Sequence, residues 1–147
     1  MDPASRNRAD SPRPSRARDE GRRALGALGE SLAAAHLERL GFAVLERNAR
    51  SRYGEIDLIA FDGSTLVFAE VKTRRARGRQ VRLGSHEPPL GALRPRQQAR
   101  LRRLALAWLS EGSRRRPTAR TIRFDAVGVT VDRRDRLVRL DHLEAAW

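Results

Sequence analysis

The most regular hydrophobic pattern in the chain lies near its middle, in two short segments. Residues 54–61 and 65–72 are both rich in β-branched and aromatic side chains, and Asp62-Gly63 separates them. This dipeptide tolerates the positive φ angles that tight turns require. The pattern therefore predicts a β-hairpin with both strands buried.

Hydrophobic residues at helical spacing predict two helices, one on either side of the hairpin. The first is expected over residues 21–40 and ends at Gly41, and the second is expected over residues 95–111. Their buried residues are expected to be Leu25, Leu28, Leu32 and either Ala35 or His36 in the first helix, and Leu101, Leu104, Ala105, Trp108 and Leu109 in the second. Further strands are expected over residues 42–50, 119–131 and 136–140. Helices and strands in this order predict an α/β fold.

The chain is expected to form one domain, residues 21–147, preceded by a disordered basic tail, residues 1–20. The tail mixes Arg, Ser, Pro, Ala and Asp and has almost no large hydrophobic side chains. The chain contains no cysteine, which excludes a disulfide framework and a cysteine-ligated metal site. No segment approaches the roughly 20 apolar residues of a membrane span, and no secretory signal is visible. These features predict a cytoplasmic protein that does not associate with membranes.

Positive charge is the strongest global feature of the sequence. The formal net charge is +13 at pH 7, and 30 of the 31 basic residues are arginine. Such a surface usually binds a phosphate polyanion, so we expect a nucleic acid partner, and DNA in particular, although composition alone does not separate DNA from RNA. Arginine-rich composition without nucleic acid binding is the alternative. The arginines expected to contact phosphates follow the hairpin or project from the second helix: Arg74, Arg75, Arg77, Arg79, Arg96, Arg100 and Arg103.

Charged residues interrupt the hairpin at positions where a core would place hydrophobic ones. Because side chains alternate between the two faces of a strand, Glu55 and Asp57 share one face, and Glu70 and Lys72 share another. Lys72 is the only lysine in the chain, although a chance position for a rare residue would also explain it. Burying such charges without partners is unfavourable. Three carboxylates beside one ammonium therefore predict a site for a hard divalent cation.

A divalent cation beside a lysine is suited to phosphodiester hydrolysis. Mg²⁺ or Mn²⁺ on Asp57 and Glu70 would neutralise phosphate charge and activate water, and Lys72 would orient or deprotonate that water. Glu30, in the first helix, is either a third ligand or an ordinary residue at the edge of a helix face, and its spacing favours neither.

Three further polar residues are expected to support this site rather than to hold the ion. Glu55 lies two residues before Asp57 and could support the metal ligands without binding the ion itself. Gln97 lies four residues before Leu101, a predicted core residue, so it should point inward and could reach the site. Asp125 lies in a predicted buried strand, and a structural ion pair with an arginine is its favoured role.

An acid followed by twelve residues and then Glu-Xaa-Lys is the pattern of the PD-(D/E)XK nuclease superfamily, and Asp57, Glu70 and Lys72 match it. Longer segments resemble the YraN family of bacterial proteins, over roughly residues 22–147. The matching segments are Leu28-Gly29-Glu30, Arg47-Asn48, residues 54–60, residues 67–74 and Arg123-Phe124-Asp125. The resemblance implies a restriction-endonuclease-like core, with a mixed β-sheet flanked by helices, similar to archaeal Holliday junction resolvases. It also implies that Glu30 joins the metal site.

The first hypothesis is a Mg²⁺-dependent endonuclease that acts on structured or damaged DNA, with Lys72, Asp57 and Glu70 as catalytic residues and Glu30, Asp57 and Glu70 as metal ligands. The second hypothesis is a nucleic-acid-binding protein whose acidic cluster is vestigial. A third is an interaction scaffold whose basic surface meets protein or RNA. A homodimer would suit a two-fold symmetric DNA junction.

Overall fold

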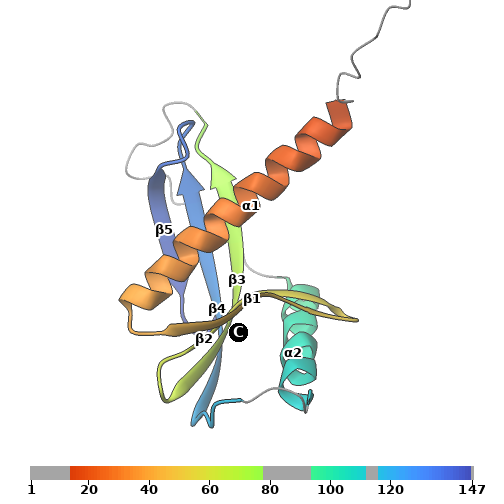
Figure 1. The fold of residues 1–147 in the computed structure, drawn as a ribbon, viewed down its shortest axis with the longest axis vertical. Coiled ribbons are helices and arrows are strands. Elements are labelled where there is room, and N and C mark those ends of the chain that lie inside the picture. Colours follow the sequence, from red (N-terminus) through yellow and green to blue (C-terminus); the bar gives the residue numbers. More distant parts are fainter. Residues whose placement is uncertain (1–13, 78–93, 112–115, 147) are drawn as a thin grey trace, which may run out of the picture.

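The computed structural model describes residues 14–77, 94–111 and 116–146, which form a β-sheet with a helix on each face (Figure 1). In chain order the elements are α1 (Pro14–Arg39), β1 (Ala43–Ser51), β2 (Gly54–Phe61), β3 (Thr65–Arg75), α2 (Pro95–Ser110), β4 (Thr121–Val131) and β5 (Leu137–Leu143). The five strands lie in the order β1-β2-β3-β4-β5, with β3 and β4 parallel and the other neighbours antiparallel. This arrangement confirms the predicted α/β fold with a mixed sheet flanked by helices.

The predicted hairpin is formed by β2 and β3. Its turn is held by Asp62, whose Oδ1 accepts hydrogen bonds from the backbone N–H groups of Ser64 at 2.9 Å and Thr65 at 2.6 Å. Gly63 has a φ of +100°, a conformation that glycine adopts without steric cost. The Asp-Gly dipeptide therefore specifies the turn as the sequence predicts.

The two faces of the sheet are covered by different helices. On one face, Ala33, Ala34 and Leu37 of α1 are fully buried against apolar residues of β2, β3 and β4. On the other face, Leu101, Leu104, Ala105 and Trp108 of α2 pack in a second cluster with Ile59, Leu66 and Phe68. Because both faces are covered, β3 and β4 are nearly continuous apolar segments, as is typical of parallel neighbours inside a sheet.

Helix α1 differs from its prediction in two ways. It begins at Pro14 rather than near residue 21, so residues 14–20, predicted to be disordered, are helical. Four of these seven residues, Arg16, Ala17, Arg18 and Glu20, favour helix even where they are exposed. The residues packed most deeply are Ala33, Ala34 and Leu37, whereas the predicted stripe of Leu25, Leu28 and Leu32 is only partly buried.

Small side chains explain this difference, because alanine and glycine let a helix axis come close to the sheet. The predicted stripe of Leu25, Leu28 and Leu32 has larger side chains, which pack beside the contact between α1 and the sheet and stay partly exposed. The other boundaries agree with the predictions to within three residues, and β5 extends to Leu143 because that residue pairs with Ala126 of β4. Neither helix in the described ranges is long and apolar enough to cross a membrane.

Helix α1 comes very close to the sheet at Gly29. A Cβ atom added there would lie 1.7 Å from Oγ1 and 2.7 Å from Cβ of Thr73 on β3. We therefore expect Gly29→Ala to push α1 away from β3 and to lower the free energy of unfolding by about 1–3 kcal/mol, the usual range for overpacking. Urea denaturation of the wild type and the variant measures this difference.

Gly26→Ala is the matched control on the same helix. A Cβ atom at Gly26 would have nothing within 4 Å, so this change should stabilise the protein by about 0.5–1 kcal/mol through helix propensity. Equal stability of the two variants would contradict the close contact at Gly29.

Candidate metal site where the sheet divides

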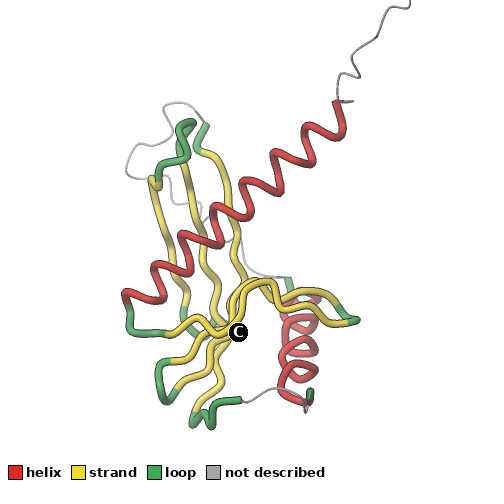
Figure 2. Tube along the Cα trace, in the orientation of Figure 1, coloured by secondary structure: helices red, strands yellow, loops and turns green. Residues whose placement is uncertain are grey.

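The candidate site lies where the five-stranded sheet splits into two parts. The β2–β3 ladder ends at the pair Leu58–Ala69. Beyond this pair, β2 continues with β1 as far as the pair Ser51–Gly54, whereas β3 continues with β4 to the pair Arg75–Val131. Figure 2 shows the two pairs of strands leaving each other, with the β1–β2 hairpin passing towards α2. Asp57 and Glu70 are the first residues beyond the last β2–β3 pair.

Asp57 connects the two strands at the point where their ladder ends. Its Oδ2 accepts a hydrogen bond of 2.7 Å from the backbone N–H of Val71. This N–H lies just past the last residue of β3 that pairs with β2, so the carboxylate takes the place of a ladder acceptor. Asp57, predicted from the sequence to be a metal ligand and catalytic residue, thus also bridges the two strands.

The side-chain alternation of β2 is also interrupted at Asp57. Leu58 packs in the cluster under α1, and regular alternation would place Ile56 on the same face. Ile56 instead packs with Ile59 in the cluster under α2. The strand therefore twists locally around Asp57, which lets Glu55 and Asp57 approach α1.

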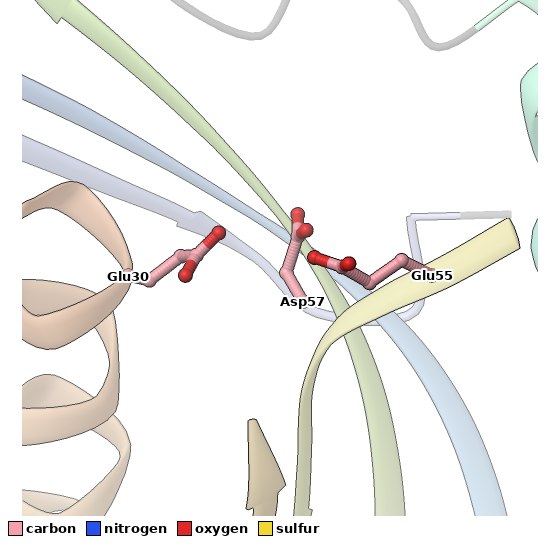
Figure 3. Close-up of side chains that lie close together, drawn as sticks. All are labelled: Glu30, Glu55 and Asp57. Atoms are coloured by element: carbon pink, nitrogen blue, oxygen red, sulfur yellow. The ribbon is translucent and has the colours of Figure 1, made fainter. Parts of the chain in front are cut away.

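Three carboxylates converge at this twist. One oxygen from each of Glu30, Glu55 and Asp57 can be chosen so that all three atoms lie within 4.8 Å of one another. In Figure 3, Glu30 extends from α1 towards the two acids of β2. Gly29 places Glu30 there, because its missing side chain lets α1 rest against Thr73. All three residues are partly buried.

The electrostatic environment of Asp57 reflects this crowding. Burial, followed by repulsion from Glu70, Glu30 and Glu55, raises the pKa of Asp57 to about 7, against the opposing hydrogen bond from Val71. A carboxyl group with this pKa is about half protonated at neutral pH. At Asp57, burial and carboxylate repulsion therefore outweigh the hydrogen bond from Val71.

Glu70 and Lys72 form the second part of the site. Lys72 Nζ lies 3.9 Å from Glu70 Oε1, and the side chains are 43% and 14% exposed respectively. Burial raises the pKa of Glu70, while the charges of Lys72 and Arg100 act to lower it. Glu70 is thus enclosed as predicted, whereas Lys72 is only half-buried and open to solvent. Arg100 brings a positive charge from α2 to the same region.

The predicted metal ligands are Glu30, Asp57 and Glu70, and the three-carboxylate group differs from this set at one position. Glu55, expected to support the metal ligands without binding the ion, belongs to the group, and Glu70 instead pairs with Lys72. The donors suit a hard cation, because two oxygens on opposite sides of Mg²⁺ are about 4.2 Å apart and Mg²⁺ prefers carboxylate and water ligands. Small side-chain rotations would bring the three oxygens to such distances.

The other two supporting residues have structural partners. Gln97 Oε1 accepts a hydrogen bond of 3.2 Å from the backbone N–H of Arg94 and so caps its own helix. Asp125 is fully buried and binds Arg123 at 2.8 Å and His142 at 2.7 Å. Burial acts to raise the pKa of Asp125, but hydrogen bonds from His142, Arg123 and the Ala145 backbone outweigh it and lower the pKa. The favoured ion-pair role of Asp125 is confirmed.

The predicted phosphate-binding arginines divide into groups. Arg96, Arg100 and Arg103 are exposed on α2, at a spacing that places them on one side of the helix. Arg75 binds the backbone oxygen of Asp132 and the carboxylate of Asp135 in the β4–β5 turn. Arg74 contacts Thr130 at 3.3 Å, Arg77 is exposed, and Arg79 lies outside the described residues.

Comparison with known proteins gives the family of the chain. Residues 29–129 match the uncharacterised protein family UPF0102. A UPF0102 protein of Streptomyces griseus is 50% identical over 113 residues, covering 77% of this chain and 87% of the relative. Others from Acidothermus cellulolyticus (46% identity; 74% and 82% coverage) and Geobacter sulfurreducens (42% identity; 84% and 88% coverage) are similar. The chain belongs to this family, which confirms the resemblance to YraN proteins.

The raised pKa of Asp57 predicts a pH-dependent effect of Asp57→Asn. The unfolded chain loses this proton near pH 3.8, whereas the folded protein keeps it until about pH 7, so stability falls as the pH rises between these values. Asparagine removes the charge and keeps an acceptor for Val71. We expect Asp57→Asn to raise the melting temperature of the metal-free protein at pH 8 and to change it little near pH 4.

Asp62→Asn is the control, because it should change the melting temperature at pH 8 in the opposite direction. Backbone hydrogen bonds from Thr65 and Ser64 lower the pKa of Asp62, so its ionised form stabilises the fold above the ordinary carboxyl pKa. This variant should therefore melt at a lower temperature at pH 8. A lower melting temperature for Asp57→Asn at pH 8 as well would show that the acidic cluster is not under electrostatic strain.

Proposed function

We propose that this member of the UPF0102 family is a metal-dependent endonuclease that hydrolyses phosphodiester bonds in DNA. The observation that carries the proposal is the convergence of Glu30, Glu55 and Asp57 from two elements at the point where the sheet divides. The chain is otherwise strongly basic, with a net charge of +13. An acidic cluster within a basic protein suits a cation that mediates contact with a polyanion.

The acidic residues would bind the ion and fix its position. Mg²⁺ or Mn²⁺ held by Glu30, Glu55 and Asp57 would neutralise charge on the scissile phosphate and lower the pKa of the attacking water. Asp57 is positioned by its bond to Val71, and Glu30 by the contact between Gly29 and Thr73. Glu70 adds a further carboxylate close enough to raise the pKa of Asp57.

Lys72 is the residue proposed to act on the water or on the developing negative charge. Its ammonium is close to Glu70, which orients it, yet the side chain is open enough to contact a substrate. A lysine in this position can donate hydrogen bonds to phosphate oxygens as charge develops in the transition state. Arginine would carry the same charge in a larger and planar group, so Lys72→Arg tests the geometry separately from the charge.

The exposed arginines of α2 would bind the substrate on either side of the reacting phosphate. Arg100 is near enough to Glu70 to affect its pKa, which places this arginine beside the site. Arg96 and Arg103 extend the same side of the helix. Arg75 is less suited to this role, because its guanidinium is already paired with Asp135 at 2.7 Å.

The proposal predicts metal-dependent cleavage that Lys72→Ala abolishes. We expect the wild type to cut at least one member of a labelled panel of duplex, nicked, flapped, four-way-junction and single-stranded DNA, and RNA, with Mg²⁺ or Mn²⁺. Lys72→Ala should lower kcat roughly 10²- to 10⁴-fold, the usual effect of removing a group that transfers protons or stabilises charge. The dissociation constant for the same substrate should change little.

Arg133→Ala is the control, because it removes one exposed positive charge in the β4–β5 turn, away from the acidic cluster. Its cleavage rate should match that of the wild type. Salt-sensitive DNA binding without cleavage under either metal would contradict the enzymatic proposal and would favour a non-catalytic nucleic-acid-binding protein.

A further inference from the structure

The β1–β2 hairpin ends in an exposed tyrosine beside an arginine. Ser51 and Gly54 are the last paired residues, so Arg52 and Tyr53 form the turn. Tyr53 is 42% exposed and is the only exposed Phe, Trp or Tyr within the described ranges. The guanidinium of Arg52 lies over its ring, 4.7 Å from the centroid, and also donates to its hydroxyl group. An aromatic ring is therefore presented at the tip together with a positive charge.

Local contacts restrain the backbone of this tip. Ser51 Oγ accepts a hydrogen bond of 3.1 Å from the backbone N–H of Tyr53. Arg50 and Glu55, which face each other across the hairpin, form an ion pair of 3.2 Å. These contacts lower the backbone entropy that the turn would lose if the ring bound a ligand.

The tip is also connected to the basic side of α2. Gly54 has a φ of +133°, and a Cβ atom at this position would lie 3.6 Å from Arg100 Nη1 and 3.8 Å from Leu104. Arg100 is therefore close to the hairpin tip, and its charge also acts on Glu70, opposing the rise in pKa that burial causes. Figure 2 shows the tip of the hairpin reaching past α2 in this view.

The spacing between the tip and the acidic cluster matches a short length of nucleic acid. Tyr53, in the turn, precedes Asp57 by four residues, which corresponds to at most about 13 Å along an extended chain. The same few nucleotides of one strand could therefore contact both the ring of Tyr53 and the acidic cluster.

We infer that Tyr53 stacks on an unpaired base of a nucleic acid and so directs the protein to DNA with a single-stranded segment close to the scissile phosphate. The inference rests on the proposed function. Aromatic rings bind exposed base faces, and these faces are available in gaps, bulges and flaps but are stacked inside an intact duplex. The hairpin end favours a polyanion over a protein partner, since residues 47–56 contain three arginines (Arg47, Arg50 and Arg52) and one acid, Glu55, which Arg50 already binds.

Tyr53→Leu and Tyr53→Phe separate stacking from general stability and hydrophobicity. Binding is measured without divalent ions, so that no cleavage occurs, to a duplex and to the same duplex with a short gap carrying 2-aminopurine. Tyr53→Leu should weaken binding to the gapped DNA roughly tenfold, within the range of one lost base stack, and weaken binding to the duplex less than about twofold. Tyr53→Phe should bind both like the wild type. The wild type and Tyr53→Phe should quench the 2-aminopurine fluorescence, and Tyr53→Leu should not.

The outcomes distinguish this inference from the function on which it rests. Equal affinities of Tyr53→Leu and the wild type for gapped DNA, or equal losses for both DNAs, would overturn the stacking role and leave the proposed endonuclease intact. Failure of the wild type to bind either DNA would overturn the stacking role, whereas metal-dependent cleavage of the substrate panel decides the proposed function separately. Thermal unfolding of each variant checks that the exposed substitution leaves the fold unchanged.

Discussion

Burial of several carboxylates close to one another is the constraint on which the site depends. Asp57 lies where β2 separates from β3, and it is surrounded by Glu30, Glu55 and Glu70. The separation makes room for these acids and also leaves the Val71 N–H beyond the ladder, where Asp57 binds it. The sheet thus accommodates the buried Asp57 carboxylate, which is electrostatically unfavourable but also joins β2 to β3. Such an arrangement is typical of functional sites, where charge is placed for chemistry rather than for stability.

Local sequence chemistry predicted most of the fold. Asp62-Gly63 specifies the hairpin, Pro95 starts α2, and segments rich in β-branched and aromatic residues mark the strands of the hairpin, so these elements agree closely with the structure. The leucine stripe predicted for α1 does pack against the core but is only partly buried, because close contact with a sheet favours small residues such as Ala33 and Ala34. The pattern of residues along one strand also gives no warning that β2 leaves β3 beyond Leu58, because that separation depends on how two strands pair.

The same limit explains which parts of the site were predicted. Glu30, Asp57, Glu70 and Lys72 were all named from the sequence, and the structure brings them to one region. Glu55 was assigned only a supporting position from the sequence. The twist at Asp57, which brings Glu55 beside Glu30, is a tertiary feature that the pattern along one strand does not reveal. Its shared strand face with Asp57 was the available signal. Tyr53 was not identified, since a single tyrosine before a glycine does not reveal that it forms an exposed hairpin tip.

Direct binding of Mn²⁺, measured by isothermal titration calorimetry, tests the central claim of a carboxylate metal site. We expect Glu30→Gln, Glu55→Gln and Asp57→Asn each to weaken binding, and Glu38→Gln, an exposed change on the same helix, to have no effect. Below pH 7, affinity of the wild type should fall by up to about tenfold per pH unit, because the ion displaces the proton on Asp57. Undetectable binding, or wild-type affinity in the Glu30 and Glu55 variants, would contradict the claim.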